Sequence, residues 1–174
     1  EMCIRDSPKA YRKAVALLAE SEFIDIFGVE NSLTPAMDLF TKLGYLGLTC
    51  RLNTDAYLQQ IGAGHLPHGA VAVAFSHSGS SADTVKALRL AKSHGAKTIA
   101  ITNAIGAPLA SWADVTLLTG RDSHTIYGNA IFSRVADTAL VDMLYMGVIL
   151  SGYGRFSTAL DESGRMIRDR VFEN

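Results

Sequence analysis

Serine hydroxyls gather in one short segment of the chain, and they are well suited to binding an anion. The segment is Ser76-His77-Ser78-Gly79-Ser80-Ser81, which follows the apolar run at 70–75 and precedes helical spacing from Ala82. The first N–H groups of a helix lack partners within the helix, and the peptide dipoles add partial positive charge there. An anion at this point gains backbone and hydroxyl donors, and Gly79 lets the backbone approach it closely. The pattern therefore predicts a phosphate-binding loop.

Helix capping is the alternative use of these serines. Ser80 and Asp83 have the spacing of a capping box, with Asp in the place usually held by Glu. One cap needs one hydroxyl, whereas this segment holds four serines and a glycine within six residues. We therefore favour the phosphate interpretation and keep capping as the alternative.

A second polar loop repeats this arrangement earlier in the chain. The run at 23–28 is typical of a buried strand, and helical spacing begins near Pro35. Asn31, Ser32 and Thr34 lie between them and form a second candidate cradle for an anion. Capping is again the alternative, because Ser32 or Thr34 ahead of Pro35 is an ordinary helix start.

Alternating strand and helix patterns position both loops. Strand-like runs lie at 23–28, 46–52, 70–75, 97–102 and 114–118, and helical spacing lies at 8–21, 35–44, 53–62, 82–94 and 130–150. The alternation predicts an α/β fold with three layers, α/β/α, around a five-stranded parallel sheet. In the flavodoxin-like strand order 2-1-3-4-5, the first and third strands are neighbours. Both serine loops then flank the switch point of the sheet, where such folds bind ligands.

Composition narrows the class of protein. The 174 residues suit one domain, and a net charge of −1 without a basic stripe argues against nucleic-acid binding by this segment. The longest apolar region, 139–150, contains Asp142 and is too short to span a bilayer, so no membrane partner is expected. Cys3 and Cys50 lack the spacing of metal ligands, which favours a reduced, cytoplasmic protein.

No metal or other cofactor is predicted. His65 and His68 lie three residues apart in a turn-rich segment. Neither has a carboxylate or cysteine close by in the sequence, and solvated loop histidines are the simpler interpretation.

The remaining segments suggest how the domain is bounded and assembled. Residues 1–7 show no clear period and are expected to be a non-native or artefactual leader, 8–155 the domain, and 156–174 a helical tail. The helix at 130–150 is apolar almost all round, with Val135, Met143, Met146 and Leu150 on one stripe. Such a helix needs cover on several sides, which predicts a homo-oligomer, dimer or tetramer, formed through it.

The phosphate-binding loop resembles that of the sugar isomerase (SIS) domain family, whose pattern is S-x-S-G-x-T; Ser81 stands at the threonine position. The segment from Gly28 to Ser32 resembles the family's first ligand loop, G-x-G-x-S, with Glu30 at the second glycine. The resemblance covers nearly all of 9–150 and implies that phosphosugars bind here. It implies that Ser76, Ser78 and Ser81 hold the phosphate, that His77 offers its backbone N–H, and that Ser32 contacts the sugar. The expected ligand-binding residues are Asn31, Ser32, Ser76, His77, Ser78, Gly79, Ser81 and Ser133.

Within that family, the chain is most similar to the C-terminal effector domain of RpiR-type transcriptional regulators. The similarity lies in FIDIFGVENS, in KLG, and in SRVADTALVDMLY, which matches the pattern S-R-x-A-x-x-x-L-x-D-x-L-Y. Such regulators carry an N-terminal helix-turn-helix domain, so contact with DNA is implied only through a domain missing from this chain. Ser133 and Arg134 match the pattern, although an arginine at a helix start could equally form a structural ion pair.

The choice between sensor and enzyme depends on a catalytic base. Isomerisation of a sugar phosphate needs a carboxylate or histidine that moves a proton between adjacent carbons. Residues 31–161 contain no glutamate, which leaves Glu30, His77, His124 and Asp83 as candidates. We therefore predict a sensor with no catalytic residue, and keep a phosphosugar isomerase or lyase as the alternative. A domain that only dimerises is the third possibility.

Overall fold

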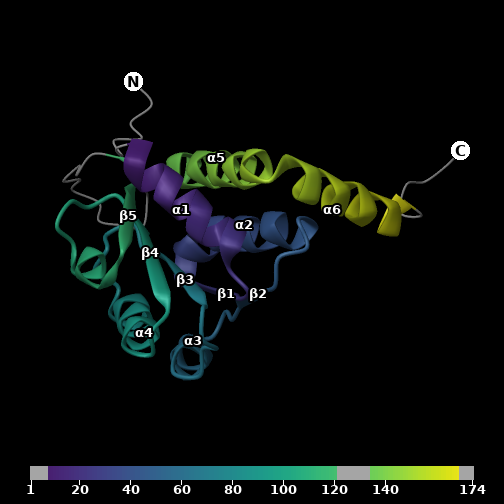
Figure 1. The fold of residues 1–174 in the computed structure, drawn as a ribbon. Coiled ribbons are helices and arrows are strands. Elements are labelled where there is room, and N and C mark those ends of the chain that lie inside the picture. The colour runs from purple at the N-terminus through teal and green to yellow at the C-terminus, as the bar shows by residue number, and fades with distance from the viewer. Residues whose placement is uncertain (1–7, 121–133, 169–174) are drawn as a thin grey trace, which may run out of the picture.

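A parallel sheet of five strands forms the centre of the molecule (Figure 1). The computed structural model describes residues 8–120 and 134–168, so the expected leader at 1–7 and the candidates Ser133 and His124 lie outside the described residues. The strand order β2-β1-β3-β4-β5 confirms the predicted order. The strands are β1 (Ile24–Phe27), β2 (Cys50–Leu52), β3 (Val71–Phe75), β4 (Lys97–Thr102) and β5 (Val115–Leu118).

Helices cover both faces of the sheet, which confirms the three-layer prediction (Figure 1). One layer contains α1 (Pro8–Glu20), α2 (Leu33–Tyr45) and α5 (Val135–Ser151), and the other contains α3 (Ala56–Ala63) and α4 (Ala82–Ser93). Two short 3-10 helices, η1 (Glu30–Ser32) and η2 (Pro108–Trp112), lie in the loops after β1 and β4. The last helix, α6 (Tyr153–Met166), extends beyond the sheet and crosses the predicted domain boundary at residue 156.

No single helix in the described ranges is both long and apolar enough to cross a membrane. Within the part of the chain that the structure describes, only α5 and α6 counted together reach the necessary length and composition, and the chain bends by 116° between them.

The two faces of the sheet carry side chains of different size. Along β3, Val71, Val73 and Phe75 pack into the larger core under α1, α2 and α5. The alternating residues Ala72 and Ala74 face the core that α4 completes. Because successive side chains of a strand point to opposite faces, this fully buried strand reads as a continuous apolar run. The loop that follows β3 is thus anchored to the most buried part of the sheet.

The second strand is shorter than the predicted run at 46–52. Gly47 has a φ of +73°, its N–H donates to Gly44 O at 3.0 Å, and the Leu48 N–H donates to Leu43 O at 3.2 Å. These two bonds form a Schellman motif that ends α2. Leu46 and Leu48 are buried at this helix end, so their apolar character does not indicate a strand.

Helix α5 has two apolar sides, and only one of them packs into the core, against α1 and α2. Leu140, Val141, Leu144 and Val148 are fully buried. The predicted stripe lies on the opposite side, where Val135, Met143, Met146 and Leu150 are 74%, 39%, 49% and 69% exposed. Met143, Met146 and Leu150 thus form an apolar surface on α5 that the described residues leave partly exposed.

Candidate ligand-binding site

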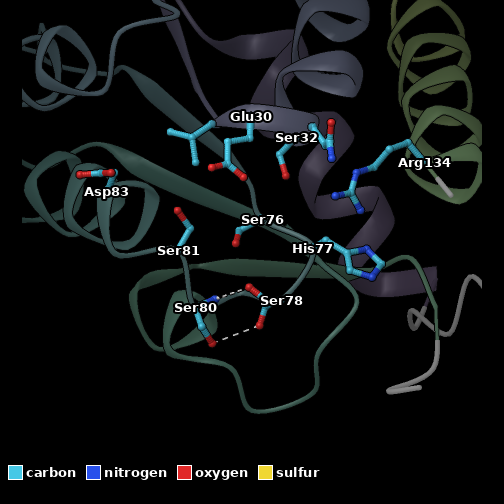
Figure 2. A pocket seen from close by; sticks show the side chains of 11 residues that line it. Glu30, Ser32, Ser76, His77, Ser78, Ser80, Ser81, Asp83 and Arg134 are labelled. Carbon is cyan, nitrogen blue, oxygen red and sulfur yellow. Dashed lines mark hydrogen bonds between the residues drawn. The ribbon is translucent and has the colours of Figure 1, made fainter. Parts of the chain in front are cut away.

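An open pocket of 710 Å³ lies where β1 and β3 end. These strands pair in parallel, so the loops that follow them emerge side by side at one edge of the sheet. The start of α5 completes the wall (Figure 2). The lining residues are Val29, Glu30, Asn31, Ser32, Ser76, His77, Ser78, Ser80, Ser81, Asp83 and Arg134.

The structure brings most of the predicted site residues together. Both loops contribute, with Asn31 and Ser32 from the first, and Ser76, His77, Ser78 and Ser81 from the second. Gly79 does not line the pocket, and Ser133 lies outside the described residues. The pocket therefore joins, at the switch point of the sheet, two loops that are about 45 residues apart in the sequence.

The capping box considered as the alternative use of the serines does not form. Ser81 is the N-cap residue of α4, and its side chain makes no capping hydrogen bond. Ser80 instead bonds within the loop, with its hydroxyl donating to Ser78 O at 3.2 Å (Figure 2). Asp83 accepts a bond from Gln60 Nε2 at 3.2 Å. The first N–H groups of α4 are thus left to a ligand or to solvent, together with the loop hydroxyls.

Gly79 has a packing role that differs from the predicted one. Its φ is +63°, and a Cβ atom there would lie 2.3 Å from Ala107 Cβ and 2.8 Å from Thr102 Oγ1. Its N–H donates to Ser76 O, and its carbonyl accepts from Leu109 N–H, both at 2.9 Å. The close approach that requires glycine is therefore to the segment after β4, and the loop is fixed to that segment.

The loop after β1 is held by one buried glutamine. Gln59, from α3, is 1% exposed. Its Nε2 donates to Gly28 O at 2.7 Å and to Asn53 O at 2.8 Å, and its Oε1 accepts from Gly28 N–H at 3.3 Å. Ser32 is the N-cap residue of α2, but its side chain makes no capping hydrogen bond. The alternative prediction, in which the Ser32 hydroxyl caps this helix, is therefore not confirmed.

Glu30 occupies an unusual backbone conformation in the same loop. Its φ is +51°, and among the described residues no other residue apart from glycines has a positive φ. A positive φ favours glycine, and the pattern G-x-G-x-S, which this loop resembles, has a glycine at position 30. Glu30 therefore keeps the loop conformation of a glycine while adding a carboxylate to the pocket wall.

Arg134 brings positive charge to the pocket from the N-cap position of α5. Its Nε and Nη1 atoms are buried and have no hydrogen-bond partner among the described residues. The ion pairs found in the described ranges do not include Arg134, so the structural ion pair considered from sequence is not found there. Buried guanidinium donors without partners favour an anionic ligand.

The positive charge of Arg134 also affects the pKa of the His77 imidazole. Burial and the nearby Arg134 guanidinium lower the pKa of the His77 imidazole, while Asp137 acts in the opposite direction. Its backbone carbonyl accepts from Asn103 N–H at 3.0 Å and from Thr102 Oγ1 at 3.1 Å, which fixes the loop to the end of β4. The neutral form of the imidazole is thus favoured.

Sequence reasoning did not assign five of the lining residues as ligand-binding: Val29, Glu30, Ser80, Asp83 and Arg134. The available signal for Arg134 was its place beside Ser133 in the matched pattern. Asp83 follows the serine loop within the first turn of α4. No group of three or more His, Cys, Asp or Glu residues that could hold a metal ion occurs in the described ranges.

Residues 17–147 match the family described as the SIS domain. The chain belongs to the SIS domain family. An uncharacterized HTH-type transcriptional regulator of Caldanaerobacter subterraneus subsp. tengcongensis is 31% identical over 162 residues, which are 93% of this chain and 57% of that regulator. The HTH-type transcriptional regulator RpiR of Escherichia coli K12 is 26% identical over 143 residues, 82% of this chain and 48% of that protein. This SIS chain therefore spans about half the length of the curated relatives it matches.

Solved structures share the fold of this SIS domain. The Vibrio vulnificus NanR protein complexed with ManNAc-6P has a TM-score of 0.89 at 24% identity, over 96% of this chain and 63% of that one. The sugar isomerase domain of the RpiR transcription factor from Sphaerobacter thermophilus has a TM-score of 0.81 at 24% identity, over 91% and 87% of the two chains. The expected fold and family are thus confirmed.

Proposed function

We propose that this SIS domain is the phosphosugar-binding effector domain of an RpiR-type transcriptional regulator of sugar metabolism that acts in the cytoplasm. The observation that carries the proposal is the pocket in which the serine loop meets the Arg134 guanidinium, whose buried Nε and Nη1 atoms have no partner among the described residues. The curated relatives are HTH-type regulators, and NanR was solved with a phosphorylated amino sugar. Contact with DNA would be made by a helix-turn-helix domain outside this chain.

The ligand would bind across both loops. The phosphate accepts hydrogen bonds from the Ser76, Ser78 and Ser81 hydroxyls, from the first N–H groups of α4 and from Arg134, with the His77 N–H as a further donor. Asn31 and Ser32 contact the sugar from the opposite wall. Ser133 remains a proposed contact next to Arg134.

The proposed regulator works as a homo-oligomer formed through α5. The exposed stripe of Val135, Met143, Met146 and Leu150 is the surface that a second copy would cover. Arg134 starts the same helix, so ligand binding and subunit contact involve one element. A ligand that prefers one of two subunit arrangements would shift the equilibrium between them and so move attached DNA-binding domains.

A thermal-shift screen tests the proposed ligand class. The panel contains hexose, pentose and amino-sugar phosphates, with each unphosphorylated sugar as its control. A ligand at a hundred times its Kd should add about 2.7 kcal/mol of stability, which is a measurable rise in Tm. A rise that requires the phosphate supports the proposal. If no phosphate compound shifts Tm, the domain serves assembly alone.

A phosphosugar isomerase remains the second candidate function, because Glu30 and His77 line the same pocket. Either group could act as the base that isomerisation requires. Incubation of a binding phosphosugar with the protein, followed by chromatography of the sugar, separates the two functions. The sensor proposal expects the ligand to be recovered unchanged, whereas an interconverted sugar would establish the enzyme.

A further inference from the structure

The charges around the pocket do not suit a plain sugar phosphate. Among the described residues, the charged side chains that line it are the Arg134 guanidinium and the carboxylates of Glu30 and Asp83. A phosphate group adds about two negative charges at neutral pH. Together these groups leave an excess of negative charge within one pocket, which a neutral sugar does nothing to compensate.

The two carboxylates differ in how they are engaged. Asp83 already accepts a hydrogen bond from Gln60 Nε2 at 3.2 Å. Glu30 takes part in none of the ion pairs found in the described ranges. Figure 2 shows Glu30 on the wall opposite Ser76 and Ser81, beside Ser32, where the sugar of a bound phosphosugar would lie. Glu30 is therefore the carboxylate placed to meet the sugar.

We propose that Glu30 determines specificity and makes this pocket selective for a phosphosugar that carries a protonated amino group. This inference rests on the proposed function. The ammonium group of such a ligand would pair with the Glu30 carboxylate while its phosphate binds the serine loop and Arg134. Each charge of the ligand then faces its opposite, and the excess negative charge is reduced.

A hydroxyl group of a neutral sugar could also donate to Glu30, but that bond needs no charge. A glutamine at position 30 keeps an acceptor oxygen and nearly the same size, so it can still accept a hydrogen bond from such a hydroxyl but cannot form an ion pair with an ammonium group. The Glu30→Gln variant therefore separates recognition by charge from recognition by shape. It also has the same backbone requirement at the positive φ, so the comparison does not alter the strain of the loop.

Calorimetric titrations with glucosamine 6-phosphate and mannosamine 6-phosphate test this selectivity. Their N-acetylated and 2-hydroxy counterparts carry the same phosphate without the positive charge. The wild-type protein should bind an amino-sugar phosphate about five to ten times more tightly than either uncharged counterpart. Glu30→Gln should abolish this preference, whereas Glu22→Gln, the same change at an exposed glutamate outside the pocket, should preserve it.

Three results would overturn the inference in distinguishable ways. Equal or tighter binding of an uncharged phosphosugar by the wild-type protein would refute the selectivity alone and leave the proposed function standing. A preference that persists in Glu30→Gln would refute the role of Glu30. Failure of every phosphorylated compound to bind would refute the proposed function, and this inference with it.

Discussion

At the scale of single residues, the hydroxyls around the pocket and the guanidinium of Arg134 offer the donors that the proposed anion binding needs, without a lysine. Ser81 and Ser32 each precede a helix, yet neither side chain caps it. The buried Nε and Nη1 atoms of Arg134 have no partner among the described residues. Polar groups in such positions are satisfied by a ligand or by water, and a phosphate offers oxygen acceptors to all of them.

Replacement of Ser81 by alanine should weaken phosphosugar binding about tenfold or more. The hydrogen bond lost is one to a charged group, worth about 1.5–3 kcal/mol, and each 1.4 kcal/mol is a factor of ten in Kd. Calorimetry measures this loss, and Ser111→Ala, an exposed serine outside the pocket, is the control. Unchanged affinity in both Ser81→Ala and Ser78→Ala would refute the claim that the serine loop binds the phosphate.

The imidazole of His77 should titrate below its ordinary pKa of about 6.5 in the ligand-free protein and shift upward when a phosphosugar binds. Burial and Arg134 lower the pKa of the free form, and a bound dianion favours the imidazolium. Because the folded state disfavours the charged form, this histidine contributes stability above pH 6.5 that is lost as the pH falls. NMR titration of the ring protons measures both effects. If the ligand does not change the titration midpoint of His77, the anion does not bind beside this imidazole.

At the scale of elements, the pocket depends on contacts that hold two loops against neighbouring segments. Gln59 ties the loop after β1 to α3, and the Gly79 contacts tie the loop after β3 to η2. Neither Gln59 nor Gly79 lines the pocket, although Gly79 was expected to be a ligand-binding residue. The shape of the site is therefore maintained from outside the pocket, by the motif glycine Gly79 and by Gln59, which no quoted motif includes.

Gln59→Ala should lower the free energy of unfolding by about 1–3 kcal/mol and weaken ligand binding as well. The variant leaves the buried N–H and carbonyl of Gly28 without their partner, which costs about that much. Chemical denaturation measures the loss, and Gln60→Ala at the neighbouring, partly exposed glutamine is the control, with an expected change below about 0.5 kcal/mol. Equal stability of the two variants would show that Gln59 does not hold the loop.

Strand and helix periods are local signals, so their alternation allowed the parallel sheet of five strands to be predicted. The strand order 2-1-3-4-5 was taken from the flavodoxin-like fold, and it placed the two serine loops side by side. The pairing of the loop after Phe27 with the loop after Phe75 followed from topology. Other features depend on tertiary contacts, which the periodicity of apolar residues does not indicate. Both sides of the helix at 135–151 are apolar, so the sequence could not distinguish the side that meets the sheet. The close packing of Gly79 against Ala107 could not be predicted from the sequence either, because these two residues belong to segments that only the fold brings together.

At the scale of the whole molecule, the α5 stripe predicts self-association. Met146→Lys should reduce the mass of the particle in sedimentation, because a charge would have to be buried in an apolar interface. Met146 is 49% exposed in the single chain, so the substitution should leave its fold intact. Met166→Lys, at a 78% exposed methionine near the end of α6, is the control. A wild-type protein that sediments as a monomer would contradict this prediction.

The central claim is that the pocket recognises a phosphate group. The most direct measurement is a calorimetric titration with a phosphosugar selected by the thermal-shift screen and with the same sugar lacking its phosphate. The account predicts that the phosphorylated sugar binds at least about a hundredfold more tightly, since several charge-assisted bonds are lost without the phosphate. Affinities within about threefold of each other would contradict the account, because the serine loop and Arg134 would then contribute nothing to recognition.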